Sequence, residues 1–260
     1  MNALIGQSPT VVTMTLRALA RHPERRAFVW EDGLLTYRAA YDLIGRLQAA
    51  MAAAGVKKGQ TVAFLSANSA ETWCAGVAAQ GLGAVVTWLH PLGSLDDHLD
   101  VIEDADVSCV LVDPRLQHLL PHVPVPKIPI PAVLGRVNVD RAYEPRPLGP
   151  DTPALMLYTS GTTGKPKGVV HSHATTNAQI ACLIAAWEWT PDDRIPHFLP
   201  LHHVHGLVNK LLCPLWVGAR CDFFSRFDAS VVFEALASKP YSIFMAVPTI
   251  YSKAIAAWEA

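Results

Sequence analysis

Charge of either sign is scarce in this chain of 260 residues. Only 17% of the residues are charged, and 21 lysines and arginines stand against 22 aspartates and glutamates. The formal net charge of -1 provides no overall field to attract nucleic acid or an anionic membrane, so we expect no nucleic-acid partner. The hydrophobic content of 51% excludes disorder as the main state.

Paired cysteine motifs and long apolar runs are also missing. The five cysteines lie far apart and never form CxxC, which favours buried thiols in a reducing compartment. The longest uncharged stretch, 72–95, is interrupted by Gly, His and Pro and does not predict a membrane span. We expect a cytoplasmic protein. The mitochondrial matrix is the alternative, because the N-terminal stretch before Glu24 has no acidic residue, although spacing at Met14, Leu16 and Leu19 also predicts a docked helix there.

Apolar, β-rich stretches alternate with amphipathic ones, which predicts an α/β fold of mostly parallel strands flanked by helices. Ser94 and Asp97 form a capping-box pattern ahead of a helix. We expect strands at 61–65, 84–87, 108–112, 154–158, 168–171, 194–199, 220–224 and 241–246. We expect the remaining helices at 69–80, 174–187, 208–216, 229–237 and from 248 onward.

Prolines concentrate in one segment of the chain. Residues 121–153 hold nine of the 20 prolines and cannot sustain a helix, so we interpret them as an extended connector. The sequence therefore predicts an α/β lobe at 1–120 and a second one at 154–260.

The densest chemical signal is YTSGTTGKPKG at 158–168, placed between two predicted strands. Its glycines let the backbone approach a ligand, and its hydroxyls and lysines suit anionic oxygens, so the loop predicts phosphate binding. The binding residues that we expect are Thr159, Ser160, Gly161, Thr162, Thr163, Gly164, Lys165 and Lys167. A Walker A loop is disfavoured, because Pro166 stands where Ser or Thr is needed.

This string resembles the nucleotide-binding signature of the adenylate-forming (AMP-binding) enzymes, which include the acyl-CoA synthetases. The segment 35–71 is similar to the N-terminal lobe of that family. The resemblance implies that the chain forms part of the large N-terminal domain and that the loop handles the phosphates of ATP. It also implies that the Thr163 hydroxyl helps to hold Mg²⁺, and that Thr163 and Lys167 act in catalysis.

The second signal is PLHHVHG at 200–206, on a predicted strand-to-helix turn. Three histidines at this spacing could bind Zn²⁺, or could simply be hydrogen-bonded in a turn. The family resemblance favours a third interpretation, an acyl pocket formed by His202, His203, His205 and Gly206, with His203 in a catalytic role. Lys210, further along the same predicted helix, is expected to face solvent.

The stretch 189–253 is similar to malonyl-CoA synthetases, whereas the first half resembles acyl-CoA synthetases in general. The resemblance implies ATP-dependent activation of a carboxylic acid, with CoA as co-substrate. Malonate or another short dicarboxylate is the leading substrate, and a medium- or long-chain fatty acid is the alternative. The family's Tyr-Gly-x-Thr-Glu segment, ribose-binding Asp and C-terminal domain with its Lys have no counterpart here, so we interpret the chain as a fragment with little turnover of its own.

Two functions of other classes remain open at this stage. One is a non-catalytic remnant that binds nucleotide or a partner, and the other is a zinc hydrolase that uses the histidine cluster. Metal analysis would expose the second.

Overall fold

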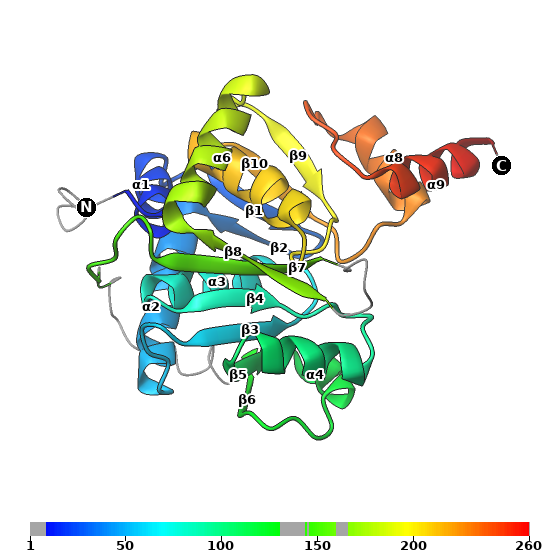
Figure 1. The fold of residues 1–260 in the computed structure, drawn as a ribbon. Helices are drawn as coiled ribbons and strands as arrows, with labels where there is room; N and C mark the ends of the chain where they lie inside the picture. Colours follow the sequence, from blue (N-terminus) through cyan, green and yellow to red (C-terminus); the bar gives the residue numbers. More distant parts are fainter. Residues whose placement is uncertain (1–8, 131–143, 145, 160–165, 260) are drawn as a thin grey trace.

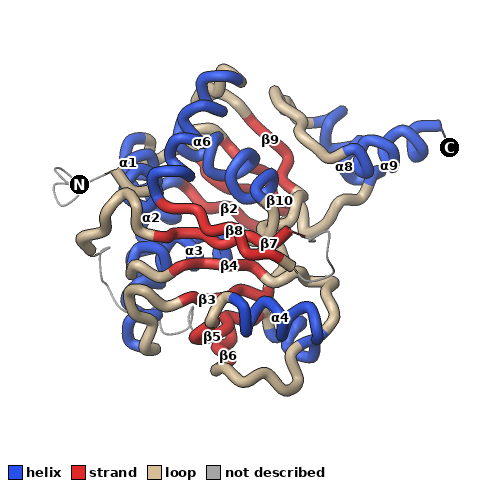
Figure 2. The backbone as a smooth tube through the Cα atoms, in the orientation of Figure 1, coloured by secondary structure: helices blue, strands red, loops and turns tan. Residues whose placement is uncertain are grey.

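The computed structural model describes residues 9–130, 144, 146–159 and 166–259. Its strands form two sheets in the middle of the molecule with helices around them, and α8 and α9 lie together at one end (Figures 1 and 2). The expected α/β class is confirmed. Within the described residues, no helix has the length and apolar character needed to cross a membrane.

The larger sheet has six strands in the order β6-β5-β3-β4-β7-β8, and all run parallel except β8, which is antiparallel to β7. Their bounds are β3 Thr61–Leu65, β4 Val85–Trp88, β5 Val107–Val112, β6 Lys127–Pro129, β7 Pro153–Thr159 and β8 Lys167–Ser172. The chain runs from β3 to β4 on one side and then crosses to β5 on the other. Ligands of open parallel sheets bind at the carboxyl ends of strands beside such a reversal.

The smaller sheet has four strands in the order β2-β1-β10-β9, of which β1, β10 and β9 are parallel. Their bounds are β1 Arg26–Trp30, β2 Gly33–Thr36, β9 Arg194–His197 and β10 Arg220–Phe223. Both sheets therefore contain strands from both sides of the segment 121–153, and the predicted lobes 1–120 and 154–260 do not coincide with the sheets.

Several helices begin where the sequence supplies capping side chains. The Ser69 hydroxyl accepts from the Thr72 N–H, Ser94 and Asp97 form the expected capping box, and Asp228 accepts from the Val231 N–H. The α-helices are α1 Val11–Arg21, α2 Tyr37–Ala53, α3 Ala70–Gly81, α4 Leu95–Asp104, α6 His173–Ala186, α7 Cys213–Val217, α8 Ala229–Ser238 and α9 Pro248–Glu259. A 3₁₀ helix, η2, covers Pro114–Leu119, and a π-helix, η3, covers His205–Leu212.

The largest core cluster connects the two sheets. The Phe28 ring of β1 lies 5.2 Å from that of Trp73 in α3 and 5.5 Å from that of Phe223 in β10, measured between ring centroids. A second cluster lies between β3, β5 and α4, and a third, smaller one surrounds Phe198 beside α8 and α9. Four of the five cysteines are buried as expected, but Cys182 on α6 is exposed, so that part of the expectation is wrong.

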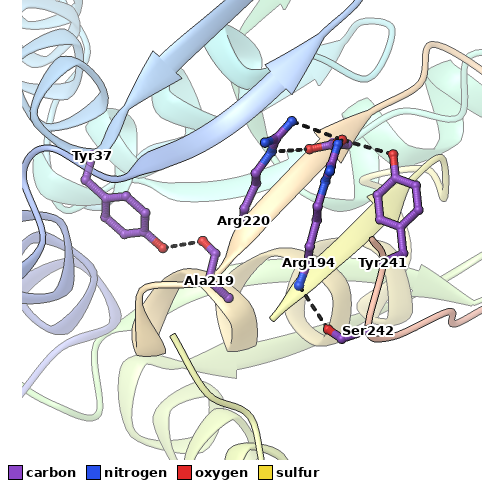
Figure 3. A network of polar contacts seen from close by, with 7 residues as sticks. Tyr37, Arg194, Ala219, Arg220, Tyr241 and Ser242 are labelled. Atoms are coloured by element: carbon purple, nitrogen blue, oxygen red, sulfur yellow. Dashed lines mark hydrogen bonds and ion pairs between the residues drawn. The ribbon is translucent and has the colours of Figure 1, made fainter. Parts of the chain in front are cut away.

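The strand expected at 241–246 is not formed. Here the Ser242 and Ile243 N–H groups both donate to the Arg194 carbonyl, at 3.1 and 3.5 Å, and the segment then continues irregularly to α9. Side chains hold it instead of a ladder. The Tyr241 hydroxyl donates to the Asp222 carboxylate, which also accepts from Arg194 and Arg220. The Ser242 hydroxyl accepts from the Arg194 N–H, as Figure 3 shows.

Candidate active site

A pocket of about 310 Å³ lies at the carboxyl ends of β4 and β7, the edge that the strand order indicates for a ligand. Trp88 and Leu89 at the end of β4 and Tyr158 and Thr159 at the end of β7 form part of its wall. The turn after β9 closes another side. The full lining is Trp88, Leu89, His90, Leu92, Gly93, Asp97, His98, Val101, Tyr158, Thr159, Pro166, His202 and His203.

The predicted phosphate loop begins and ends at this pocket. Thr159, the last residue of β7, is paired across the hairpin with Lys167, the first residue of β8, and both are exposed. Ser160 to Lys165, and with them Thr163, lie outside the described residues. The hairpin thus places both ends of the loop beside the pocket, where Thr159 and Pro166 form part of the wall.

Tyr158 joins the loop-bearing strand to the helix across the pocket. Its hydroxyl donates to the Asp104 carboxylate of α4 at 2.6 Å. Burial, and then this carboxylate, raise the pKa of Tyr158 well above its ordinary value. The phenol stays protonated and fixes the β7 end relative to α4, so its role is to position the wall of the pocket.

His90 and His98 occupy the β4 side. The Leu92 N–H donates to Nδ1 of His90 at 2.9 Å, so a neutral His90 carries its proton on Nε2. Nε2 of His98 lies 2.9 Å from the His90 carbonyl oxygen, which ties α4 to the turn after β4. The sequence reasoning missed both residues. Their signal was His90 and Pro91 directly after a predicted buried strand, at the strand end where parallel sheets bind ligands.

His202 and His203 come from the turn after β9. The ring centroid of His202 lies 4.3 Å from that of His90 and 4.1 Å from that of His203. Burial, followed by the neighbouring imidazoles, lowers the pKa of His202 to about 3, and burial and His90 lower that of His203. Both rings are therefore neutral near pH 7. Within the described residues, the buried Nε2 of His202 has no hydrogen-bond partner, so it can receive a polar ligand atom.

His205 and Gly206, the other two predicted pocket residues, begin the π-helix η3 and are not part of the pocket wall. A Cβ on Gly206 would lie 2.2 Å from the Pro200 carbonyl oxygen, so only glycine lets the π-helix pack this closely against the turn. π-helical turns occur frequently at functional sites. Here the π-helix supports the turn that carries His202 and His203.

Lys210 does not face solvent as expected: its side chain is fully buried. Its Nζ donates to the Met245 carbonyl at 2.7 Å and lies 3.9 Å from the centroid of the Phe198 ring. The expectation is wrong, and residues 205–212 form π-helical turns that place Lys210 in the core beside Phe198.

The zinc hypothesis fails on geometry within the described residues. There, no group of three or more His, Cys, Asp or Glu side chains is arranged to hold a metal ion. The site is therefore a mostly apolar pocket with the neutral imidazoles of His202 and His203 on its wall, beside the base of a Gly/Thr/Lys loop. Such a pocket can orient a small molecule next to this loop.

Solved structures share this fold. The N-terminal domain of FACL13 from Mycobacterium tuberculosis matches with a TM-score of 0.87 and 25% identity, over 95% of this chain and 65% of that one. ATP-bound MatB from Rhodopseudomonas palustris matches with a TM-score of 0.84 and 25% identity, over 94% of this chain and 51% of that one. The fold is that of the N-terminal domain of adenylate-forming enzymes, which confirms the resemblance.

The family model of the AMP-binding enzymes matches residues 16–259, and the chain belongs to this family. A relative, the mitochondrial malonate–CoA ligase ACSF3 of Mus musculus, is 38% identical over 266 residues, covering 93% of this chain and 44% of the relative. The medium/long-chain-fatty-acid–CoA ligase FadD8 of Mycobacterium tuberculosis is 32% identical, covering 90% of this chain and 44% of the relative. The chain thus spans less than half the length of these relatives.

Proposed function

We propose that the protein activates a carboxylic acid with ATP, forming an acyl-adenylate and then an acyl-CoA, and that malonate or another short dicarboxylate is the acid. The observation that carries the proposal is the position of the pocket of His202 and His203, beside the two strand ends that bear the Gly/Thr/Lys loop. Similarity to malonate–CoA ligases over 93% of the chain supports the choice of acid.

In this reaction a carboxylate oxygen attacks the α-phosphorus of ATP, and the bond to pyrophosphate breaks. The CoA thiol then attacks the acyl carbon and displaces AMP. The protein contributes alignment and charge neutralisation rather than a nucleophile of its own.

Residues 159–167 would hold the triphosphate, with Lys167 as a cation and the exposed Thr159 as a hydrogen-bond donor. Thr163 is the residue that we assign to Mg²⁺, and hydroxyl oxygens suit this ion. The metal supplies charge neutralisation at the phosphates when it is bound. Thr159 and Lys167, at the two ends of the loop, are both exposed, and a hydroxyl and an ammonium group suit phosphate oxygens, so these residues fit the nucleotide.

The size of the pocket favours a small acid over a long acyl chain. A volume of about 310 Å³ is near the lower end of the range of about 300–1,000 Å³ seen for ligand sites. A second carboxylate needs donors when it leaves water, or its burial becomes prohibitive. His203 on the wall and the unpartnered Nε2 of His202 are suitable donors.

We assign the protein to the cytoplasm, with the mitochondrial matrix as the alternative, since the mouse relative is named as mitochondrial. CoA is the co-substrate in this proposal.

The test of substrate class is a panel of malonate, acetate and octanoate in ATP–pyrophosphate exchange. The assay is run on the purified protein. We expect malonate to give the fastest exchange, and His203→Ala to raise the KM for malonate more than that for acetate. Octanoate as the best acid, or a His203→Ala variant with unchanged malonate kinetics, contradicts the assignment of malonate.

A further inference from the structure

The amine of Lys210 is fully buried. Within the described residues, it has no carboxylate partner and takes part in no ion pair. Its Nζ donates to the Met245 carbonyl at 2.7 Å and lies 3.9 Å from the centroid of the Phe198 ring. Buried lysines are rare unless they are paired, because the charged form loses its hydration. This lysine therefore calls for an explanation beyond packing.

The titratable groups that face Lys210 add no negative charge at neutral pH. They are His197 at the end of β9, His205 in η3, and Cys221 of β10. Burial lowers the pKa of Lys210 to about 7, with Cys221 acting in the opposite direction. Burial, and then the charge of Lys210, lower the pKa values of His197 and His205. Burial raises the pKa of Cys221, so its thiol stays neutral, and the other groups are all basic, so each added proton opposes the others.

The partner of Lys210 belongs to the irregular segment 241–247, which leads into α9. One end of this segment is fixed by two hydrogen bonds, from the Tyr241 hydroxyl to Asp222 and from the Arg194 N–H to the Ser242 hydroxyl (Figure 3). Toward its other end, the hydrogen bond from Lys210 reaches Met245. Lys210 thus connects this segment to the π-helix that supports the histidine turn.

We propose that Lys210 is a positioning residue, whose buried amine holds the segment 241–247 against η3 and acts through its charge on the imidazole of His205, five residues earlier. In a π-helix the backbone bonds join residues five apart, so His205 and Lys210 lie one turn from each other. The inference rests on the proposed function only in treating the turn as part of an acyl site.

The arrangement makes the segment sensitive to pH. When the segment opens and Lys210 is hydrated, the pKa of its amine returns from about 7 toward 10.5. Between these values the open form binds more protons than the closed form. The closed form therefore gains stability as pH rises above about 7, and opening becomes easier as pH falls.

The test is amide hydrogen exchange of the chain between pH 7 and 9, corrected for intrinsic rates. We expect the opening constant of 241–247 to be at least about tenfold larger at pH 7 than at pH 9, since linkage allows up to tenfold per pH unit. Lys210→Met should remove this pH dependence, whereas the exposed Lys253→Met should keep it. A purely structural role would raise exchange equally at every pH, so an unchanged pH profile in Lys210→Met overturns the proposal.

A second readout is the NMR titration of His205, which we expect at higher pH in Lys210→Met than in the wild-type chain or Lys253→Met. If His205 titrates at the same pH in all three proteins, the proposed effect of the Lys210 charge on His205 is overturned. If Lys210→Met does not fold, the Nζ of Lys210 is titrated in the ¹⁵N-lysine-labelled wild type. A midpoint near 7 supports the proposal, and one near 10.5 overturns it. None of these measurements uses ATP or an acid, so their failure leaves the proposed function standing.

Discussion

Replacing Gly206 with alanine tests the close packing beneath the histidine turn. The added Cβ would lie 2.2 Å from the Pro200 carbonyl oxygen, 3.0 Å from its carbon and 3.1 Å from the Leu199 carbonyl oxygen. Carbon atoms in contact normally lie about 3.5–4.0 Å apart, so the π-helix and the turn must separate by roughly 1 Å. Because both partners are backbone, no side-chain rotation relieves the contact.

The expected change in the free energy of unfolding of Gly206→Ala is the balance of two opposing effects. Overpacking costs about 1–3 kcal/mol, and a backbone clash this short belongs at the upper end. The better helix propensity of alanine offsets up to about 1 kcal/mol. We therefore expect the free energy of unfolding of Gly206→Ala to fall by about 2 kcal/mol in urea denaturation.

Gly149→Ala is the matched control. Its Cβ would have no neighbour closer than the Thr152 Oγ1 at 3.7 Å, an ordinary contact, so its stability should match that of the wild type. The Gly206 variant should also shift the NMR signals of His202 and His203, which the moved turn carries. If Gly206→Ala is as stable as Gly149→Ala and leaves these signals in place, the close approach at Gly206 is not what holds the turn.

Two further perturbations have calculable outcomes. Asp222→Asn leaves Arg194 and Arg220 without their carboxylate, and urea denaturation should show a loss of about 3 kcal/mol in the free energy of unfolding. This is the lower end for a buried pair, because the arginines keep 14% and 23% exposure. Glu24→Gln removes an ion pair with Arg38 in which the Glu24 side chain is 82% exposed, and it should cost under about 1 kcal/mol; an equal loss in both variants would contradict the reasoning. Folding lowers the pKa of His202 from 6.5 to about 3. As pH falls below 6.5, the unfolded chain therefore binds a proton that the folded chain does not, and the free energy of unfolding decreases. His202→Gln should reduce this slope by up to about 1.4 kcal/mol per pH unit between pH 6.5 and 4, and parallel curves for the two proteins would contradict the assignment.

Local patterns predicted most of the elements. The capping box at Ser94 and Asp97, and the Ser69 cap of α3, begin helices as expected, because these signals act within one turn. The buried strand at Thr61–Leu65 likewise follows from its continuous apolar run. Helices and strands that depend on residues close together in the sequence could therefore be predicted from the sequence.

The pairing of strands far apart in the sequence could not be predicted in this way. The proline-rich segment predicted two separate lobes, yet β1 pairs with β10 and β4 with β7, so strands from both sides share each sheet. The segment 241–246 has the composition of a strand, but the side chains of Tyr241 and Ser242 hold it where a ladder was expected. Strand order and edge pairing depend on residues far away in sequence.

The site was predicted in part. The sequence motif located His202 and His203, which the structure brings together with His90 from another strand end. The burial of Lys210 could not be predicted, because an α-helix of about 3.6 residues per turn would direct a residue five positions after His205 well away from it. Only the π-helix brings the two within a turn of each other.

The central claim is that the loop 159–168 binds the phosphates of ATP beside a pocket for the acid. It is tested most directly by ATP–pyrophosphate exchange with malonate, comparing the wild-type protein with Thr163→Ala/Lys167→Ala. Loss of a charged contact costs about 1.5–3 kcal/mol, so the double variant should exchange roughly 10- to 100-fold more slowly at limiting ATP. Exchange at the wild-type rate in that variant would contradict the claim.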